Sequence, residues 1–539
     1  MYLEKSLLTM EKSTIVEFGS STSSHRPSME KVPTLRPAEA IAEGEVTILE
    51  ENGDEARQFM GENFGEDGEE FDEEFMKKLV RKIDFTIVPL LALTYFLQFL
   101  DKTTLSYTSV MGLQTDTHLK GDEYSYLGML FYVGFLVTEL PTQWLAQKVS
   151  HLAKYLAVNI MLWGVVLSCH AACTNFAQLA VLRTLLGVFE ACVAPILVMI
   201  ISMWYKKSEQ GRRVSFFYVM NSLTSIVGGF VAYGVTFTHS HFASWRIFYL
   251  ALGLFTVACG VLVFIFLPDS PVRASGRRFS DREKRAALLR IADNQSGTQN
   301  KKLKVYQMKE ALVDVKTWLI FISVMLTSIP NGALSNFNSI IIKSFGFTSQ
   351  QTLILGTPAG LVGIVFVLGC GWLSDRLNDR SLVMLIFLIP TILGAALMVG
   401  LQHLHNKAGL LAANYLTGTF GGAFGLILAW NASNISGHSK KVVVNAMTLV
   451  SFATGNIIGT QTFRASDAPD YIPGKTAIIV CLGAQVVVSF ALRYVNIWYN
   501  KKKARVVEGM DPATREATRK HMAFADETDM RNPFFKYTN

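Results

Sequence analysis

The sequence predicts an all-α membrane protein, with twelve transmembrane helices in two pseudo-symmetric six-helix bundles. Half of its 539 residues are hydrophobic and only 17% are charged, whereas a soluble domain carries about 25% charged residues. The charges are concentrated in the first eighty and last forty residues, so the intervening chain is far more apolar than the average. In that part, apolar runs of spanning length stand in two groups of six, on either side of a charged connector.

The N-terminal segment, residues 1–78, has the composition of a disordered acidic tail. It mixes Ser, Thr, Glu and Pro and becomes strongly acidic over Gly61–Glu74. No apolar stretch follows a basic start, so the sequence shows no cleavable signal peptide. We therefore expect this tail to remain in the cytosol.

The apolar runs define two helical bundles, since about 20 residues are needed to cross the ~30 Å hydrocarbon core. We expect an N-terminal bundle over 79–267 and a C-terminal bundle over 315–499, followed by a basic cytosolic tail, 500–539. The predicted spans lie near 86–108, 126–147, 155–174, 177–202, 213–237, 246–267, 315–341, 351–373, 382–402, 408–430, 442–463 and 475–498.

The connector between the bundles, 268–314, is charged and is expected to be cytosolic. Its segment Ser280–Ile291 has a helical apolar pattern, and Ser280 and Glu283 have the spacing of a capping box. We expect an amphipathic helix here, lying along the inner leaflet.

Basic residues in the short loops predict the orientation of the chain, because such residues gather on the cytosolic side. Both termini are then cytosolic. The net charge of +7 is explained by this bias, so we expect no nucleic-acid partner. The loops on the opposite side hold only five basic residues, Lys120, Lys343, Lys407, Arg464 and Lys475. The predicted cytosolic loops, including the segment after the last span, hold many more: Lys148, Lys154, Lys206, Lys207, Arg212, Arg213, Arg376, Arg380, Lys440, Lys441, Lys501, Lys502, Lys503 and Arg505.

Motifs of catalysis and of metal binding were sought and not found. The sequence has no Walker loop, no zinc-ligand spacing and no nucleophile elbow, and its six cysteines all lie in apolar stretches. We expect neither an enzyme nor an ATP-driven pump, and neither a metal nor a cofactor.

The turn after the eighth predicted span, Gly371–Arg380 (GWLSDRLNDR), resembles the loop motif of the major facilitator superfamily. The resemblance implies that superfamily's fold and a cytosolic gate formed by Asp375, Arg376 and Arg380. The equivalent loop of the first half, Gln147–Tyr155, lacks the aspartate, so the gate is expected to be asymmetric.

More narrowly, the chain resembles the anion:cation symporter family and its fungal allantoate permease group. The resemblance covers about 80–500 and implies a carrier of allantoate, nicotinate, pantothenate or a similar carboxylate. The marks of the group are Phe99–Tyr107 (FLDKTTLSY), Arg183–Ala191 (RTLLGVFEA), Leu267–Pro271 (LPDSP) and Pro330–Phe337 (PNGALSNF).

Four ionisable residues within the predicted spans are candidate functional residues. Placing a charged side chain at the centre of a bilayer costs ~2.5–3.5 kcal/mol, so such residues are usually kept for a function. Asp101 and Lys102 lie well inside the first span. Arg183 and Glu190 are seven residues apart in the fourth span, which places them on one helix face.

The functional hypothesis assigns substrate binding to the two cations and proton coupling to the two acids. Lys102 or Arg183 would attract the carboxylate of the substrate, and Asp101 and Glu190 would take up and release a proton, in agreement with the resemblance. Related symporters often have Arg in place of Lys102, and lysine lacks the bidentate fork of arginine. The alternative is that all four residues form ion pairs that only stabilise the N-terminal bundle.

The seventh span has a polar segment around Pro330, with Asn331 and Asn336. A break in the helix at Pro-Asn-Gly would expose backbone groups, and the amides could bind a substrate. The alternative is that they join neighbouring helices.

These features predict proton-coupled uptake of a small organic anion by alternating access, in a monomer embedded in the plasma membrane. Two alternatives remain open at this point: an efflux carrier for a secondary metabolite, and a nutrient sensor that does not transport.

Overall fold

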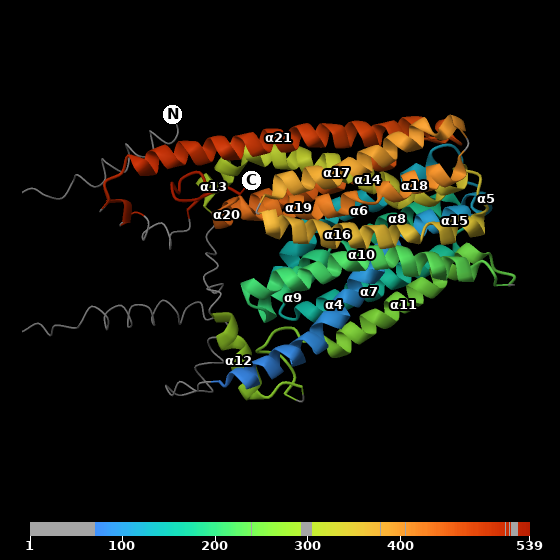
Figure 1. The fold of residues 1–539 in the computed structure, drawn as a ribbon. Helices are drawn as coiled ribbons and strands as arrows, with labels where there is room; N and C mark the ends of the chain where they lie inside the picture. The colour runs from blue at the N-terminus through green and yellow to red at the C-terminus, as the bar shows by residue number, and fades with distance from the viewer. Residues whose placement is uncertain are drawn as a thin grey trace, which may run out of the picture.

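The computed structural model describes residues 71–238, 240–276, 278–292, 304–377, 379–404, 406–512, 514–516, 518 and 527–538. The expected acidic segment Gly61–Glu74 thus lies mostly outside the described residues. Across the described residues, the regular elements are helices, and they pack side by side along a common direction (Figure 1).

The N-terminal half contains six long helical segments, one of them divided in two. The bounds are α4 (Glu73–Val110), α6 (Glu123–Lys148), α7 (Leu152–Cys169), α8 (Phe176–Glu190) with α9 (Val193–Trp204), α10 (Lys207–Val235) and α11 (Ser244–Phe266), with the short α5 (Leu113–Asp116) after α4.

The C-terminal half repeats this organisation. The bounds are α14 (Val315–Ser344), α15 (Ser349–Leu355) with α16 (Pro358–Leu377), α17 (Arg380–Gly400), α18 (Lys407–Thr417) with α19 (Phe420–Ser433), α20 (His438–Thr460) and α21 (Ile472–Glu508). Two shorter helices, α12 (Asp281–Ala292) and α13 (Val305–Val313), belong to the connector.

The packing partners show that the two halves are pseudo-symmetric. In the N-terminal half the first segment packs on the fifth (α4 on α10), the second on the fourth (α6 on α8) and the third on the sixth (α7 on α11). The corresponding contacts in the C-terminal half are α14·α20, α16·α19 and α17·α21. The predicted architecture of two six-helix bundles is therefore confirmed.

Ten of the described helical segments are long and apolar enough to cross a membrane, by length and composition. The two remaining long segments, α6 and α10, are more polar. The helix α6 carries Glu139 and Gln143, and α10 begins with charged residues. Both pack against the opposite half, α6 on α20 and α10 on α16, so protein covers part of their polar surface.

The bundle has two distinguishable ends. We call the end with the start of α4 and the close of α21 the terminal end, and the end with the 111–122 and 461–471 loops the far end (Figure 1). Hydrogen bonds between the halves lie near the far end: Ser106 Oγ donates to Ser339 Oγ at 3.1 Å, and Tyr124 Oη donates to the Asn336 carbonyl at 2.7 Å.

Three more hydrogen bonds join the halves at this end. Ser125 Oγ donates to the Phe463 carbonyl at 2.8 Å, Gln461 Nε2 donates to the Ser125 carbonyl, and the Ala465 amide donates to Asp122. The two halves are thus joined at the far end.

Close helix contacts within each half depend on glycine. A Cβ atom on Gly187 of α8 would lie 2.0 Å from the carbonyl oxygen of Phe131 in α6. A Cβ atom on Gly459 of α20 would lie 2.1 Å from the carbonyl oxygen of Ile329 in α14. Only a residue without a side chain allows these backbones to approach so closely.

The connector helix α12 is capped and bound to the N-terminal half. Both hydrogen bonds of the expected capping box are present, with the Ser280 amide on Glu283 Oε2 at 2.8 Å and the Glu283 amide on Ser280 Oγ at 3.3 Å. Lys82 of α4 pairs with Glu283 at 2.8 Å, and Arg290 pairs with Glu209 of α10.

Residues 527–538 cross the terminal end of the C-terminal half, and we call them the C-terminal strap. Its Asp529 is fully buried and pairs with Lys316 and with Lys440, the latter at 2.9 Å. Lys503 of α21 donates to three strap carbonyls, those of Asp529, Asn532 and Phe535. Three buried lysines and three carboxylates, Lys316, Lys440, Lys503, Glu310, Asp314 and Asp529, meet in this cluster.

Candidate functional site: a buried charge cluster in the N-terminal half

The centre of the N-terminal half contains the charged residues that the sequence singled out. The helix α4 runs unbroken through Asp101 and Lys102. Asp101 is buried, and its Oδ2 accepts a hydrogen bond of 2.6 Å from Trp163 Nε1 of α7. Its other oxygen, Oδ1, is buried without a hydrogen-bond partner among the described residues.

Lys102 and Glu190 form an ion pair between α4 and α8, with Nζ 3.4 Å from Oε1. Glu190 is fully buried, and neither of its oxygens has a hydrogen-bond partner within the described part of the chain. The side chain of Lys102 retains 15% of its exposure, and its Nζ lies 5.8 Å from the ring centre of Phe135. Lys102 is therefore the most accessible charge of the four.

Arg183 is held by aromatic residues. Its Nη2 donates a hydrogen bond of 2.5 Å to Tyr249 Oη of α11, and the Tyr249 ring stacks on His170 at 5.0 Å. The guanidinium also attracts Asp101, although the two do not come within the 4.0 Å of an ion pair. The Nε of Arg183 is buried without a hydrogen-bond partner among the described residues.

The cluster thus contains charge that is buried but incompletely paired. Unpaired charges are costly to bury, so they persist where protonation or a ligand compensates them. Asp101 and Glu190 can each hold a proton, and the two cations can attract an anion.

Sequence reasoning missed a third acid in this region, Glu139 of α6. It is only 2% exposed and interacts electrostatically with Lys102. The insertion cost that singled out the other four residues applies equally to Glu139, because it lies within the second predicted span, 126–147. That signal could have found it.

The polar segment of α14 is engaged in contacts between helices. Asn331 Nδ2 donates to Asn456 Oδ1 of α20 at 2.8 Å. Asn336 Nδ2 donates to the Gly332 carbonyl of its own helix at 2.8 Å. The helix continues through Pro330 from Val315 to Ser344, so the break that we considered is not present.

The residues of the expected gate are spread over the terminal end. The side chain of Asp375 lies outside the described residues, and Arg376 is exposed, with its guanidinium 5.3 Å from the Trp372 ring centre. Arg380 donates to Ser433 Oγ at 2.5 Å. A nearby ion pair that sequence reasoning missed joins Asp379 to Arg493 of α21 at 2.6 Å.

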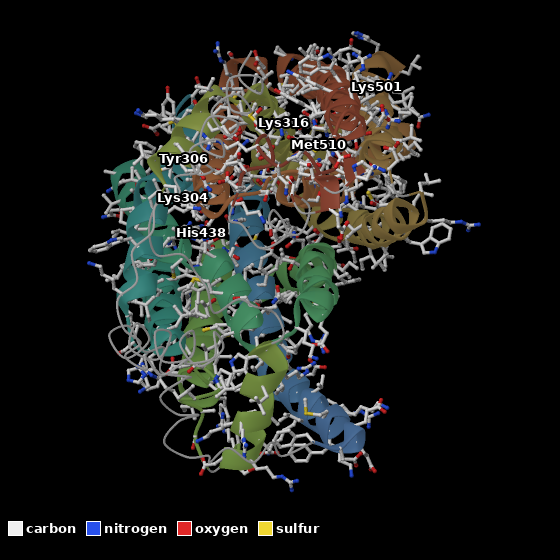
Figure 2. All side chains as sticks on the ribbon, turned by 90° about the vertical axis from the view of Figure 1, so that its left-hand side faces the viewer. Lys304, Tyr306, Lys316, His438, Lys501 and Met510 are labelled. Atoms are coloured by element: carbon white, nitrogen blue, oxygen red, sulfur yellow. The ribbon has the colours of Figure 1, made fainter. Side chains whose placement is uncertain are left out.

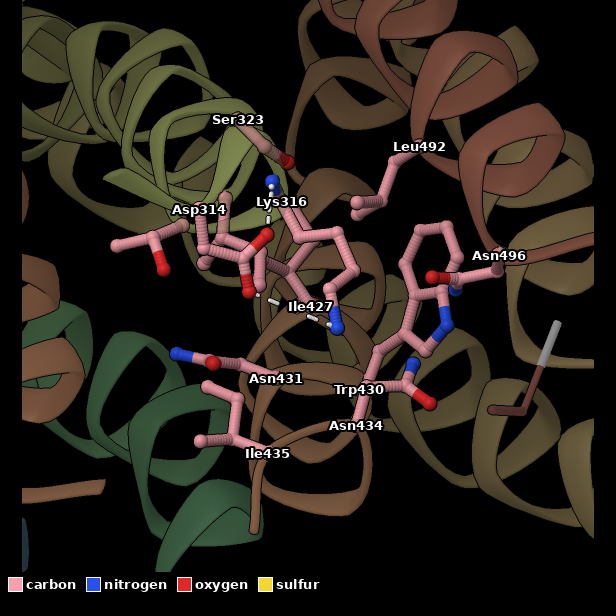
Figure 3. Close-up of a pocket in the computed structure, with 12 residues that line it drawn as sticks. Asp314, Lys316, Ser323, Ile427, Trp430, Asn431, Asn434, Ile435, Leu492 and Asn496 are labelled. Carbon is pink, nitrogen blue, oxygen red and sulfur yellow. Dashed lines mark hydrogen bonds and ion pairs between the residues drawn. The ribbon is translucent and has the colours of Figure 1, made fainter. Parts of the chain in front are cut away.

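A second polar region, in the C-terminal half, is a small pocket among α14, α19 and α21 (Figure 3). Its lining includes Lys316, Trp430, Asn434 and Asn496. Trp430 Nε1 and the Asn434 and Asn496 amides all donate to the Thr538 carbonyl, at 2.8, 3.1 and 3.1 Å. These three residues therefore hold the C-terminal strap.

Within the described residues, no group of three His, Cys, Asp or Glu side chains is placed so that it could hold a metal ion.

Comparison with known proteins identifies the architecture. Residues 91–460 match the family model of the Major Facilitator Superfamily. The fold is similar to that of the xylose transporter XylE from E. coli in a partially occluded inward open conformation, with a TM-score of 0.56, 15% identity, and coverage of 74% of this chain and 96% of that chain. It is also similar to a bacterial homologue of the human lysosomal transporter Spinster in an inward-facing conformation, with a TM-score of 0.57, 14% identity, and coverage of 76% and 96%.

Sequence relatives are found among fungal transporters. The allantoate permease of Saccharomyces cerevisiae is 38% identical over 478 residues, which cover 86% of each chain. The thiamine pathway transporter THI73 of the same yeast is 36% identical over 469 residues, which cover 86% of this chain and 87% of the relative. The chain is a membrane transporter that belongs to the major facilitator superfamily, in the group of fungal transporters that includes the yeast allantoate permease.

Proposed function

We propose that this protein takes up a small organic anion together with a proton. The observation that carries the proposal is the charge cluster, in which Lys102 retains exposure while Asp101 and Glu190 are buried with oxygens that accept no hydrogen bond. Lys102 is the first cation that a carboxylate would meet. Arg183, only 3% exposed, would act from behind it by raising the positive potential around Asp101.

Coupling to a proton follows from the charge of the cluster. An anion that enters a buried site adds a negative charge to a region that already holds Asp101 and Glu190. Protonation of one of these carboxylates restores the balance, because a neutral acid is much less costly to bury than a charged one. Binding of the anion and of the proton would therefore favour each other.

Alternating access would use the two ends of the bundle. Hydrogen bonds such as Ser106–Ser339 join the far end, so we assign this conformation to a carrier that is closed at the far end. Lys304, Lys316 and Lys501 all lie at the terminal end (Figure 2). Basic residues favour the cytosolic side. We thus assign the terminal end to the cytosol and the far end to the outside of the plasma membrane.

The substrate class rests on the relatives and on the cluster together. Allantoate is a carboxylate, and an anion of this kind suits a site whose accessible charge is the Lys102 ammonium. We expect a small carboxylate with amide or ureido groups, which the amides of Asn331 and Asn336 could bind if their helix contacts rearrange during the cycle.

The experiment that tests this proposal is uptake of radiolabelled allantoate, ureidosuccinate, nicotinate and pantothenate by permease-deficient yeast that express the chain. Uptake is measured at acidic and neutral external pH, with and without a protonophore. Accumulation of one carboxylate that increases with acidity and collapses with the protonophore would support the proposal. Absence of accumulation of every compound, with the protein verified at the cell surface, would contradict it; outward movement of a preloaded solute would instead indicate efflux.

A further inference from the structure

A buried carboxylate that the proposed mechanism does not use lies next to its central cation. Glu139 lies within α6 and is 2% exposed. Its charged neighbour is Lys102 of α4. Acids buried inside membrane spans are rare and usually have a functional reason.

Lys102 lies close to both of the helices that carry Glu139 and Glu190. The Lys102 ammonium lies over the ring of Phe135, and Glu139 is four residues further along α6, on the same helix face. The same ammonium contacts Glu190 of α8 at 3.4 Å. One cation is thus shared by acids from two helices.

The two acids also lie on the same side of the contact between their helices. The helices α6 and α8 run in the same direction, separated by the single segment α7. They touch where a Cβ atom on Gly134 would meet the Thr184 carbonyl and one on Gly187 would meet the Phe131 carbonyl. Glu139 follows Gly134 by five residues and Glu190 follows Gly187 by three. At about 1.5 Å of rise per residue, the two acids thus lie within a few Å of each other in depth.

The charge of the whole cluster requires a proton. Asp101, Glu139 and Glu190 provide three negative charges, and Lys102 and Arg183 provide two positive charges. The tyrosines around the cluster, Tyr124, Tyr132, Tyr155 and Tyr249, are neutral at ordinary pH, so they do not change this balance. His170, which stacks on Tyr249, would add a positive charge only by binding a proton itself. With every acid ionised, one negative charge would be buried without a partner, which is strongly unfavourable.

We propose that Glu139 is a second partner of Lys102 and a third acid of the proton pathway, an inference that rests on the proposed function. Lys102 remains an ammonium and moves between Glu190 and Glu139 during the transport cycle. The carboxylate that it leaves takes a proton from water and becomes a neutral acid, and the carboxylate that it approaches releases its proton to water. One proton is therefore bound and one released for each movement of Lys102.

The first test is independent of transport. A double-mutant cycle compares the thermal unfolding of the purified native protein with that of Glu139→Gln, Lys102→Gln and the double variant. A shared interaction predicts that the effects on the unfolding temperature are not additive, with a deviation of about 2 °C or more. Additive effects would overturn the proposed contact. Thr138→Val, next to Glu139 and bonded only to its own helix, serves as the control.

The second test is the pH profile of uptake. Glu139→Gln is expected to reduce the acid-driven accumulation of the substrate at least about fivefold, while exchange of labelled for unlabelled substrate remains within about twofold of native. Glu139→Asp should restore part of the acid response. An unchanged pH profile in Glu139→Gln would overturn the proposal while native proton-driven uptake stands. Proton-independent uptake by the native protein would contradict the proposed function itself, and the double-mutant cycle would still decide whether Lys102 and Glu139 are partners.

Discussion

Lys102 and Glu190 form an ion pair whose Nζ and Oε1 atoms lie 3.4 Å apart, with Glu190 fully buried. This separation exceeds the ~2.7–2.9 Å of a strong charge-assisted hydrogen bond. Neither oxygen of Glu190 accepts a hydrogen bond of good geometry from a described residue, and Gln98 is its other polar neighbour. The pair is thus suited to separate during transport. Glu190 would then bind a proton in place of Lys102, and Lys102 would bind the anion in place of Glu190.

Glu190→Gln should abolish proton-driven accumulation. The amide cannot bind and release a proton, so transport would continue only down the gradient of the substrate. We expect uptake at acidic pH to decrease at least about tenfold, with exchange of labelled for unlabelled substrate retained. Glu190→Asp is the matched control. Accumulation by Glu190→Gln that still collapses with a protonophore would remove Glu190 from the coupling mechanism.

Lys102→Met should weaken binding of the anion. An ion pair lost from a desolvated site costs about 2 kcal/mol or more, which corresponds to a rise of about thirtyfold in the KM for the carboxylate. Lys102→Arg keeps the charge and should remain within about threefold of native. Equal KM values for Lys102→Met and the native protein would show that Lys102 serves only to neutralise acids of the bundle.

A disulfide across the far end should stop transport. The Oγ atoms of Ser106 and Ser339 lie 3.1 Å apart on helices of opposite halves, so Ser106→Cys combined with Ser339→Cys brings two thiols within bonding reach. We expect oxidation to abolish uptake and a reductant to restore it, because the far end could no longer open. Each single cysteine variant is the control. Full uptake by the cross-linked protein would contradict a cycle in which the far end opens.

The C-terminal strap should stabilise the C-terminal half through Asp529. Burial opposes the ionisation of Asp529, but Lys316 and Lys440 outweigh it and lower its pKa to about 2. Because the folded value lies below the unfolded value of about 3.9, the stabilisation is complete above about pH 4 and is lost as the pH decreases towards 2. Asp529→Asn should therefore lower the unfolding temperature by about 5–10 °C at pH 6.

The same variant provides the pH test of the strap. The difference in unfolding temperature between the native protein and Asp529→Asn should diminish between pH 4 and pH 2. Lys536→Ala, which changes an exposed strap residue, should have no measurable effect. A difference that is equal at pH 6 and at pH 2.5 would show that ionised Asp529 does not hold the strap.

The sequence predicted the two-bundle fold because its main signals are local. Spanning length and the capping box at Ser280 and Glu283 can each be recognised in a short window, and these features correspond to elements of the structure. The C-terminal strap could not be predicted in this way. Its contacts join different elements, and the pair of Asp529 with Lys316 spans more than two hundred positions, so composition alone gives no sign of them.

The charge cluster was only partly predictable. Insertion cost identifies Asp101, Lys102, Arg183 and Glu190, but their partners are a matter of three-dimensional packing. The hydrogen bonds from Trp163 to Asp101 and from Arg183 to Tyr249 join different helices, and no spacing rule specifies them. The helix break considered in α14 is absent for the opposite reason. Pro330 weakens a helix locally, yet packing of Gly332 against the Asn456 backbone of α20 keeps it continuous.

The central claim, that an anion and a proton enter together, is tested most directly in proteoliposomes that contain the purified protein and a pH-sensitive dye in the lumen. A carboxylate that the carrier accepts is added outside, with equal pH on both sides and potassium with valinomycin to clamp the voltage. We predict that the lumen acidifies as the anion enters, that the signal disappears in Glu190→Gln, and that it is absent without the carboxylate. Entry of the labelled anion with no change in luminal pH would contradict proton coupling and with it the role assigned to the buried acids.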